Sequence, residues 1–174
     1  MTVFALVPAS YVYLLREGGS GTEVLLQRRG PVPYMPDHWA AAAAGHVEPG
    51  ETAYDAARRE ALEELGITGL DLEFVLTMQR SQFGPPIEER VDWFFTARSW
   101  TGEPRIVETE KAAALGWFAL DALPEPMVPH EAHALAHLFS GAGYLTFGWD
   151  ARPGGGSRTG MAEAGSPDNK GGNR

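Results

Sequence analysis

Residues 45–67 read GHVEPGETAYDAARREALEELGI, and this stretch combines a tight turn with a helix. The letters EPGE indicate the turn, because proline and glycine favour turn geometry. A helix is predicted over residues 53–65, since Thr52 and Asp55 have the spacing of a capping box and Gly66 stands where a left-handed cap belongs.

Three glutamates share one face of this predicted helix. Glu60, Glu63 and Glu64 fall within about 100° of one another at helical spacing, so their negative charges are neighbours. Like charges at such spacings destabilise a helix by a few tenths of a kcal/mol per pair. A divalent cation would offset this cost, because Mg²⁺ binds carboxylates together with substrate phosphates. The alternative interpretation is a solvated acidic face, which is commoner when three glutamates are considered alone.

The residues ahead of the glutamates favour the metal hypothesis. Gly45, Glu51 and Arg59 precede them at fixed separations, and Arg59 can orient Glu51 through a forked hydrogen bond. Seven specified residues at fixed spacing arise by chance on the order of once in 10⁶ chains of this length. Residues 45–67 thereby resemble the Nudix box, the 23-residue motif of the Nudix hydrolases.

The resemblance implies a fold and a reaction. The fold class is α/β, a Nudix-type α/β/α sandwich with a mixed β-sheet. The reaction is hydrolysis of a nucleoside diphosphate linked to another moiety, with Mg²⁺ or Mn²⁺ as cofactor. Carried over by position, Glu60, Glu63 and Glu64 are metal ligands, the backbone carbonyl of Gly45 or of its predecessor adds another, and Arg59 braces the helix with Glu51.

The general base remains open among three glutamates. A gap-free count from the sequence WTGEP at residues 100–104 places Glu108 at the loop position used in MutT-like members, with Glu110 close behind and Glu60 as the third candidate. WTGEP and Trp39 both look like the equivalent flanks of MutT-type proteins. The alanines at 40–44 stand where the family often has a Pro-Gly pair.

Arginines and aromatic residues near predicted loops suggest substrate contacts. Arg28 and Arg29 end a predicted strand, where they could bind a phosphate or a base edge, or be a solvated strand end. Trp39, with Tyr34 and Phe83, could stack on a nucleobase or belong to the periphery of the core.

Within the enzyme class, we expect a nucleoside triphosphate pyrophosphohydrolase of the MutT kind, with an ADP-ribose or nucleotide-sugar pyrophosphatase as the alternative. From another class, a non-catalytic nucleotide-binding regulator stays open, although the intact glutamates disfavour it. A diphosphate isomerase is disfavoured because the chain has no cysteine.

Composition and charge narrow the remaining classes. The 174 residues are 44% hydrophobic and 21% charged, as in an ordinary globular domain. With zero cysteines there is no disulfide framework, thiolate metal site or thiol nucleophile. No stretch approaches the roughly 18 apolar residues of a membrane span. We expect a soluble, cytoplasmic protein without a signal peptide.

The excess of acidic over basic side chains limits the classes of molecule that the protein can bind. The formal charge is −9, and residues 151–174 contain four basic and two acidic side chains, so residues 1–150 carry −11. Nucleic acid and anionic lipid would be repelled. We therefore expect a small-molecule nucleotide as partner, with neither nucleic acid nor membrane, and a homodimer as an open option. An anionic substrate would require a bound cation.

One domain is expected over residues 1–150, followed by a disordered Gly-rich tail at 151–174 with seven glycines in 24 residues. Strands are predicted at 3–15 and 23–27, paired as a hairpin, and also at 72–78, 91–97 and 115–118. After the hairpin, Pro31, Pro33 and Pro36 exclude regular structure up to about residue 38, so a long loop is predicted there.

A second helix is expected over 131–139, with Leu135, Leu138 and Phe139 on its apolar stripe and its histidines, His130 among them, on the polar side. A zinc site at these histidines is disfavoured, because partner carboxylates at metal-site spacing are lacking. Asp92, in the middle of a predicted strand, is either solvent-facing or a polar group beneath the site.

Overall fold

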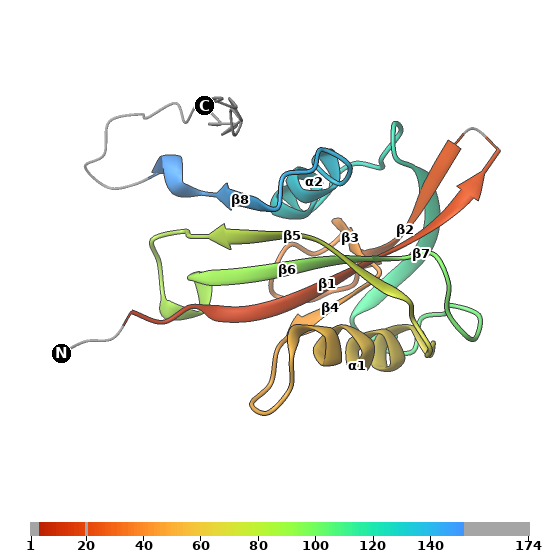
Figure 1. The fold of residues 1–174 in the computed structure, drawn as a ribbon, viewed down its shortest axis with the longest axis horizontal. Coiled ribbons are helices and arrows are strands. Elements are labelled where there is room, and N and C mark those ends of the chain that lie inside the picture. Colours follow the sequence, from red (N-terminus) through yellow and green to blue (C-terminus); the bar gives the residue numbers. More distant parts are fainter. Residues whose placement is uncertain (1–3, 20, 152–174) are drawn as a thin grey trace, which may run out of the picture.

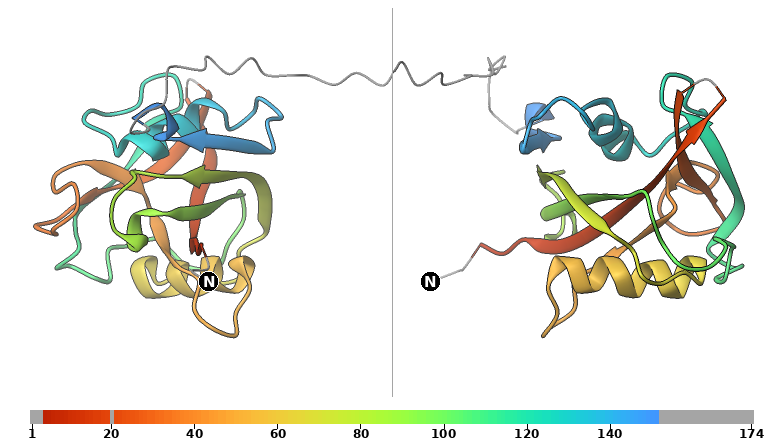
Figure 2. Two further views of the ribbon diagram at one scale, coloured as in Figure 1. Left: turned by 90° about the vertical axis from the view of Figure 1, so that its left-hand side faces the viewer. Right: turned by 45° about the vertical axis from the view of Figure 1, so that its right-hand side comes forward.

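A mixed β-sheet lies between two helices, which confirms the expected α/β/α arrangement (Figures 1 and 2). The computed structural model describes residues 4–19 and 21–151. The predicted tail lies outside the described residues except for its first position. Within the described part, eight strands run in the order β3-β2-β1-β6-β5-β8, with β4 added to β1 and β7 added to β2.

The long strand β1 (Val7–Gly18) connects the two halves of the sheet. Its first half pairs with β4 (Ala43–His46) on one side and, in parallel, with β6 (Arg90–Ala97) on the other. Its second half forms the predicted hairpin with β2 (Gly21–Arg29), in which Leu15 faces Val24. Strand β1 therefore joins β2 and β4, which come early in the chain, to β6, which comes later.

The remaining strands complete the two halves. β2 also pairs antiparallel with β3 (Trp39–Ala41) and β7 (Ala112–Ala119), whereas β5 (Leu72–Arg80) lies between β6 and β8 (Tyr144–Phe147). The predictions missed β3, β4 and β8. Alanine and glycine have low strand propensity, so β3 and β4 are fixed by pairing with β1 and β2 and not by their own sequences.

Helix α1 (Ala53–Leu65) has the bounds expected from the sequence. Its capping box is present, because the Thr52 hydroxyl accepts a hydrogen bond from the Asp55 amide while the Asp55 carboxylate accepts one from the Thr52 amide. The helix ends at Gly66, whose φ of 70° is the predicted left-handed conformation.

Helix α2 (Pro129–Ala136) differs from the helix expected over 131–139. It begins earlier because proline is favoured in a first helical turn. It ends at Ala136, so Phe139 lies beyond the helix and is 67% exposed, contrary to the prediction. His130 is buried instead of lying on a polar face, because the first turn of the helix faces the sheet. The His130 ring contacts the Tyr11 hydroxyl there.

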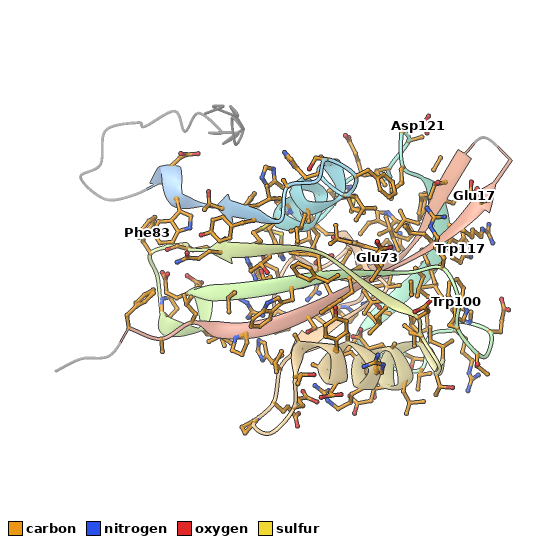
Figure 3. The ribbon with its side chains drawn as sticks, viewed as in Figure 1. Glu17, Glu73, Phe83, Trp100, Trp117 and Asp121 are labelled. Atoms are coloured by element: carbon orange, nitrogen blue, oxygen red, sulfur yellow. The ribbon has the colours of Figure 1, made fainter. Side chains whose placement is uncertain are left out.

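Alternation along β1 divides the core into two layers. Tyr11, Tyr13 and Leu15 pack on the side of α2, whereas Val12 and Leu14 pack on the side of α1. The α1 layer closes at one end with Trp100 and Trp117, whose rings stack with centroids 6.2 Å apart (Figure 3). Each helix thus covers one face of the sheet with its apolar side.

The cap of α1 gives a stability prediction. Gly66→Ala should lower the free energy of unfolding by about 1 kcal/mol, because an L side chain is strained at this positive φ and its Cβ would lie 3.3 Å from the Arg105 guanidinium carbon. Urea unfolding measures the change. Gly19→Ala is the control, since no heavy atom lies within 4 Å of its added Cβ. Equal stability of both variants would contradict the role of Gly66.

Candidate functional site

The carboxylates of α1 face the end of strand β4, which carries Gly45. β4 is held there by its pairing with β1, in which Ser10 faces Gly45, and by the Ser10 hydroxyl, which donates to the Ala53 carbonyl at the start of α1 (2.7 Å). A Cβ at Gly45 would overlap the Glu60 carboxylate. Only glycine therefore allows the backbone of β4 to approach Glu60 this closely.

Arg59 ties this cluster together. Its Nη2 donates to Glu51 Oε1 (2.8 Å) and its Nε to Glu51 Oε2 (3.2 Å), which is the forked contact expected from the sequence. Its Nη1 donates to Glu60 (2.6 Å) and Glu63 (3.2 Å), and its Nη2 also reaches the His46 carbonyl (2.9 Å). One guanidinium thus links the turn before α1, the end of β4 and two of the three glutamates.

The three glutamates differ in burial. Glu63 is exposed, Glu60 is half-buried, and Glu64 accepts a hydrogen bond from the Ala44 amide (2.9 Å). Burial raises the pKa of Glu64 to about 8, with the nearby charges of Glu60 and Glu108 adding to the effect and the Ala44 hydrogen bond opposing it. Burial also raises the pKa of Glu60. These two carboxylates are therefore costly to ionise unless a cation is near.

The loop after β6 brings Glu108 to this cluster. The Val107 amide donates to the Glu64 carbonyl (3.0 Å), and Glu108 forms an ion pair with Lys111 (2.7 Å). Glu110 is exposed, and its backbone packs against Gly30. Of the three candidate bases, Glu60 is bonded to Arg59, whereas Glu108 lies near Glu64 and is paired with Lys111.

A cavity of about 500 Å³ opens beside Glu64 and continues between β1, β5 and α2. This volume is typical of small-molecule sites. Its lining includes charged groups, loop residues and a wall of alanines: Ala9, Tyr11, Gln27, Arg29, Tyr34, Ala40, Ala41, Ala44, Gly45, His46, Glu64, Arg80, Gln82, Ile87, Glu88, Arg90, His130 and Glu131. Ala40, Ala41 and Ala44 thus leave the space open, because larger side chains would fill it.

The predicted substrate residues separate in the structure. Arg29 lines the cavity, and its Nε donates to the Tyr34 carbonyl (3.0 Å). Arg28 is exposed and lies outside the cavity lining. Trp39 packs edge-on against Phe118 with ring centroids 4.6 Å apart, so it belongs to the periphery of the core. Phe83 packs against Trp149, whereas Tyr34 lines the cavity.

Sequence reasoning missed a buried ion-pair network at the floor of the cavity. Asp92 is fully buried, which resolves its two interpretations in favour of a polar group beneath the site. It accepts hydrogen bonds from Arg80 Nε (2.9 Å) and Arg90 Nε (3.4 Å), and Arg90 also contacts the His46 ring (2.8 Å). The available signal was a charged residue within a strand with arginine two positions before it.

Glu131 was also missed. It is 3% exposed and accepts a hydrogen bond from the Ala41 amide. An acidic residue in a first helical turn is usually read as a favourable charge at the positive end of the helix dipole, so the sequence carried no signal of burial.

Hard oxygen donors gather at this site, as a divalent cation requires. Among residues 4–19 and 21–151, no group of three acidic or histidine side chains is arranged to hold a metal ion. Glu60 and Glu63 are instead bonded to Arg59. No helix in the described ranges is long and apolar enough to cross a membrane.

Comparison with known proteins agrees with this geometry. The family model described as the NUDIX domain matches residues 5–138. The chain is 35% identical over 129 residues to the NAD-capped RNA hydrolase NudC of Chromobacterium violaceum, covering 74% of this chain but only 44% of that protein. It is 31% identical over 133 residues to a putative 8-oxo-dGTP diphosphatase of Bacillus subtilis, covering 76% and 80%.

Among solved structures, a MutT NUDIX hydrolase from Burkholderia pseudomallei superposes with a TM-score of 0.67 at 30% identity, covering 76% of this chain and 97% of that one. The family match over residues 5–138 includes helix α1, which bears the three glutamates. The chain therefore belongs to the Nudix family.

Proposed function

We propose that the protein is a metal-dependent hydrolase of the diphosphate linkage in nucleoside triphosphates, of the MutT kind, and that it releases a nucleoside monophosphate and pyrophosphate. One observation carries the proposal. Glu64 lines a cavity whose other lining residues are apolar and polar side chains, and the cavity of about 500 Å³ has room for a nucleobase. A nucleotide can therefore place its phosphates at the glutamates while its base lies between β5 and α2.

Mg²⁺ or Mn²⁺ fits the residues present. Glu60, Glu63 and Glu64 would hold it, with the backbone carbonyl of Ala44 or Gly45, and the space that Gly45 leaves beside Glu60 supports this set. When bound, the cation neutralises phosphate charge and activates water. Arg59 positions Glu60 and Glu63, and Arg29, which lines the same cavity as Glu64, supplies positive charge to the substrate.

Glu108 is the general base in this proposal, because its loop is anchored to the backbone of Glu64 and Glu60 is held by Arg59. The similarity to a MutT hydrolase and to a putative 8-oxo-dGTP diphosphatase supports triphosphates as substrates. The similarity to an NAD-capped RNA hydrolase keeps dinucleotide-like substrates as the second candidate. We place the protein in the cytoplasm, in keeping with nucleotide substrates.

The test is product release from nucleoside triphosphates, ADP-ribose, nucleotide sugars and NAD-like dinucleotides, each with Mg²⁺ or Mn²⁺. Release of pyrophosphate from triphosphates supports the proposal. Cleavage confined to dinucleotides or ADP-ribose would replace it with the second candidate. If no compound is cleaved, the hydrolase proposal is wrong, and a non-catalytic nucleotide-binding regulator becomes the hypothesis to test by ligand-induced thermal shifts.

Glu63→Gln should lower kcat at least about 100-fold, because a lost metal ligand removes stabilisation of the transition state. Glu73→Gln is the matched control, since Glu73 is an exposed carboxylate on β5 that does not line the cavity (Figure 3). Steady-state kinetics compares them. Unchanged kcat in Glu63→Gln would remove Glu63 from the metal site.

Gly45→Ala should lower activity at least about 10-fold, because the added Cβ displaces the Glu60 carboxylate. Gly143→Ala, where no heavy atom lies within 4 Å of the new Cβ, should retain activity. Circular dichroism of both variants checks that the fold is intact. Full activity of Gly45→Ala would show that the position of Glu60 is unimportant.

Millimolar Mg²⁺ should raise the Tm of the wild-type protein, because a ligand that binds only the folded state stabilises it and relieves repulsion among the glutamates. Glu64→Gln should abolish this shift and Glu73→Gln should retain it. Differential scanning fluorimetry without nucleotide measures the three values. Equal shifts in all three proteins would place Mg²⁺ binding elsewhere.

A further inference from the structure

The side chain of Glu108 has one buried oxygen that receives no hydrogen bond. Within the described ranges, Oε2 of Glu108 is the one buried side-chain polar atom without a hydrogen-bond partner. The carboxylates of α1, by contrast, accept hydrogen bonds from Arg59 or from the Ala44 amide. A buried carboxylate oxygen without a donor is costly, so Glu108 needs another source of stabilisation.

Lys111 supplies this stabilisation through its charge. Its Nζ lies 2.7 Å from Glu108 Oε2, as an ion pair without the orientation of a hydrogen bond. The contact with Glu108 raises the pKa of Lys111, and the negative charges of Glu64 and Glu60 add to the effect. The ammonium group of Lys111 is therefore charged at neutral pH.

The other oxygen of Glu108 is accessible. The side chain is 32% exposed although Oε2 is buried, and Oε1 has no hydrogen-bond partner among the residues that the structure describes. A general base needs an oxygen within hydrogen-bond reach of the water whose proton it accepts. Glu108 meets this need if the ion pair fixes Oε2 and leaves Oε1 to the water.

Backbone hydrogen bonds hold Lys111 on two sides. Its amide donates to the Glu108 carbonyl (3.0 Å), which closes the turn between the two residues, and its carbonyl accepts from the Gly30 amide just after β2 (2.7 Å). A Cβ at Gly30 would lie only 3.0 Å from the Glu110 carbonyl oxygen, so the two segments are in close contact. The side chain of Lys111 therefore starts from a fixed point, three residues from Glu108.

The position of Lys111 indicates that it acts through protein carboxylates. It does not line the cavity in which we place the nucleotide. Its charge lowers the pKa of Glu60 and Glu64, against the effect of their burial, but the carboxylate that it pairs with directly is Glu108. Arg59 makes the corresponding contacts on α1 with Glu60 and Glu63.

We propose that Lys111 is a positioning residue, which holds Glu108 Oε2 so that Glu108 Oε1 accepts the proton of the attacking water. Without the ammonium group, the negative charges of Glu60 and Glu64 would repel the Glu108 carboxylate, and it would turn toward solvent. The inference rests on the proposed function, because Glu108 is the general base there.

Lys111→Met removes the charge and keeps an unbranched side chain. We expect kcat to fall about 10- to 100-fold and KM to change less than about threefold, because a misplaced general base affects the transition state and not substrate binding. Lys111→Arg should keep kcat within about fivefold of the wild type, because it restores a positive charge at a similar reach. Steady-state kinetics at saturating Mg²⁺, with a triphosphate that the wild type hydrolyses, gives these values.

Arg98→Met is the matched control. Arg98 forms an ion pair of similar length with Glu17 (2.8 Å), but both side chains are exposed and neither lines the cavity. This variant should keep the kcat of the wild type, since an exposed ion pair contributes little. A comparable loss in both variants would show a general effect of removing a positive charge and would overturn the inference.

A double-mutant cycle separates Glu108 from the metal ligands. Adding Lys111→Met to Glu108→Gln should lower kcat no further than Glu108→Gln alone, because Lys111 acts through Glu108. Differential scanning fluorimetry should show the same rise in Tm with Mg²⁺ in Lys111→Met as in the wild type, since Lys111 is not needed for metal binding. The Tm without Mg²⁺ checks that the variant is folded.

Unchanged kcat in Lys111→Met would overturn the inference, as would losses that multiply in the double mutant. Loss of the Mg²⁺ effect on Tm in Lys111→Met would also overturn it, because Lys111 would then act on the metal site. If the wild type hydrolyses triphosphates but Glu108→Gln keeps full kcat, the inference is wrong and the hydrolase proposal stands. If the wild type cleaves nothing, both are wrong.

Discussion

The contacts of Arg59 are the interaction on which the site depends. This guanidinium holds Glu51 in the turn before α1, the carbonyl of His46 at the end of β4, and the carboxylates of Glu60 and Glu63. The guanidinium carries five donors in a rigid planar fork, whereas lysine has three donors on a flexible stem and offers no fixed planar geometry. The loop, the strand and the helix are consequently fixed relative to one another by a single side chain.

The folded chain brings these carboxylates together at a place where burial disfavours their charged form. Glu64 lies against the amide of Ala44, and Gly45 leaves space for Glu60. Burial raises the pKa of Glu60 and Glu64, so folding alone holds these groups in an unfavourable state. A bound cation would offset the cost of ionising these carboxylates. An acidic protein that binds an anionic substrate needs such a cation to reverse the local electrostatic field.

At the floor of the cavity, buried charged side chains are also held in place by hydrogen-bond partners. Asp92 lies inside the sheet and anchors Arg80 and Arg90, which costs desolvation but holds the guanidinium of Arg80 in one orientation. Glu131 is anchored by the Ala41 amide. Arg80, Arg90 and Glu131 line the same cavity, so these anchored side chains fix part of its charge pattern.

Features that depend on near neighbours in the chain could be predicted before the structure was known. The span of α1, its capping box, the hairpin of β1 and β2, and the shared face of Glu60, Glu63 and Glu64 all follow from spacings of a few residues. Residues 45–67 also carried enough fixed positions to indicate the family.

Features that join distant segments of the chain became visible only in the folded protein. Alanine-rich β3 and β4 are strands because β1 and β2 pair with them, and the buried contact of Glu131 with Ala41 joins residues 90 positions apart. The cavity, its arginine floor and the placement of Trp39 in the periphery of the core arise in the same way. Local sequence patterns report torsional preference and neighbouring charge, whereas burial and pairing depend on which segments the folded sheet brings together.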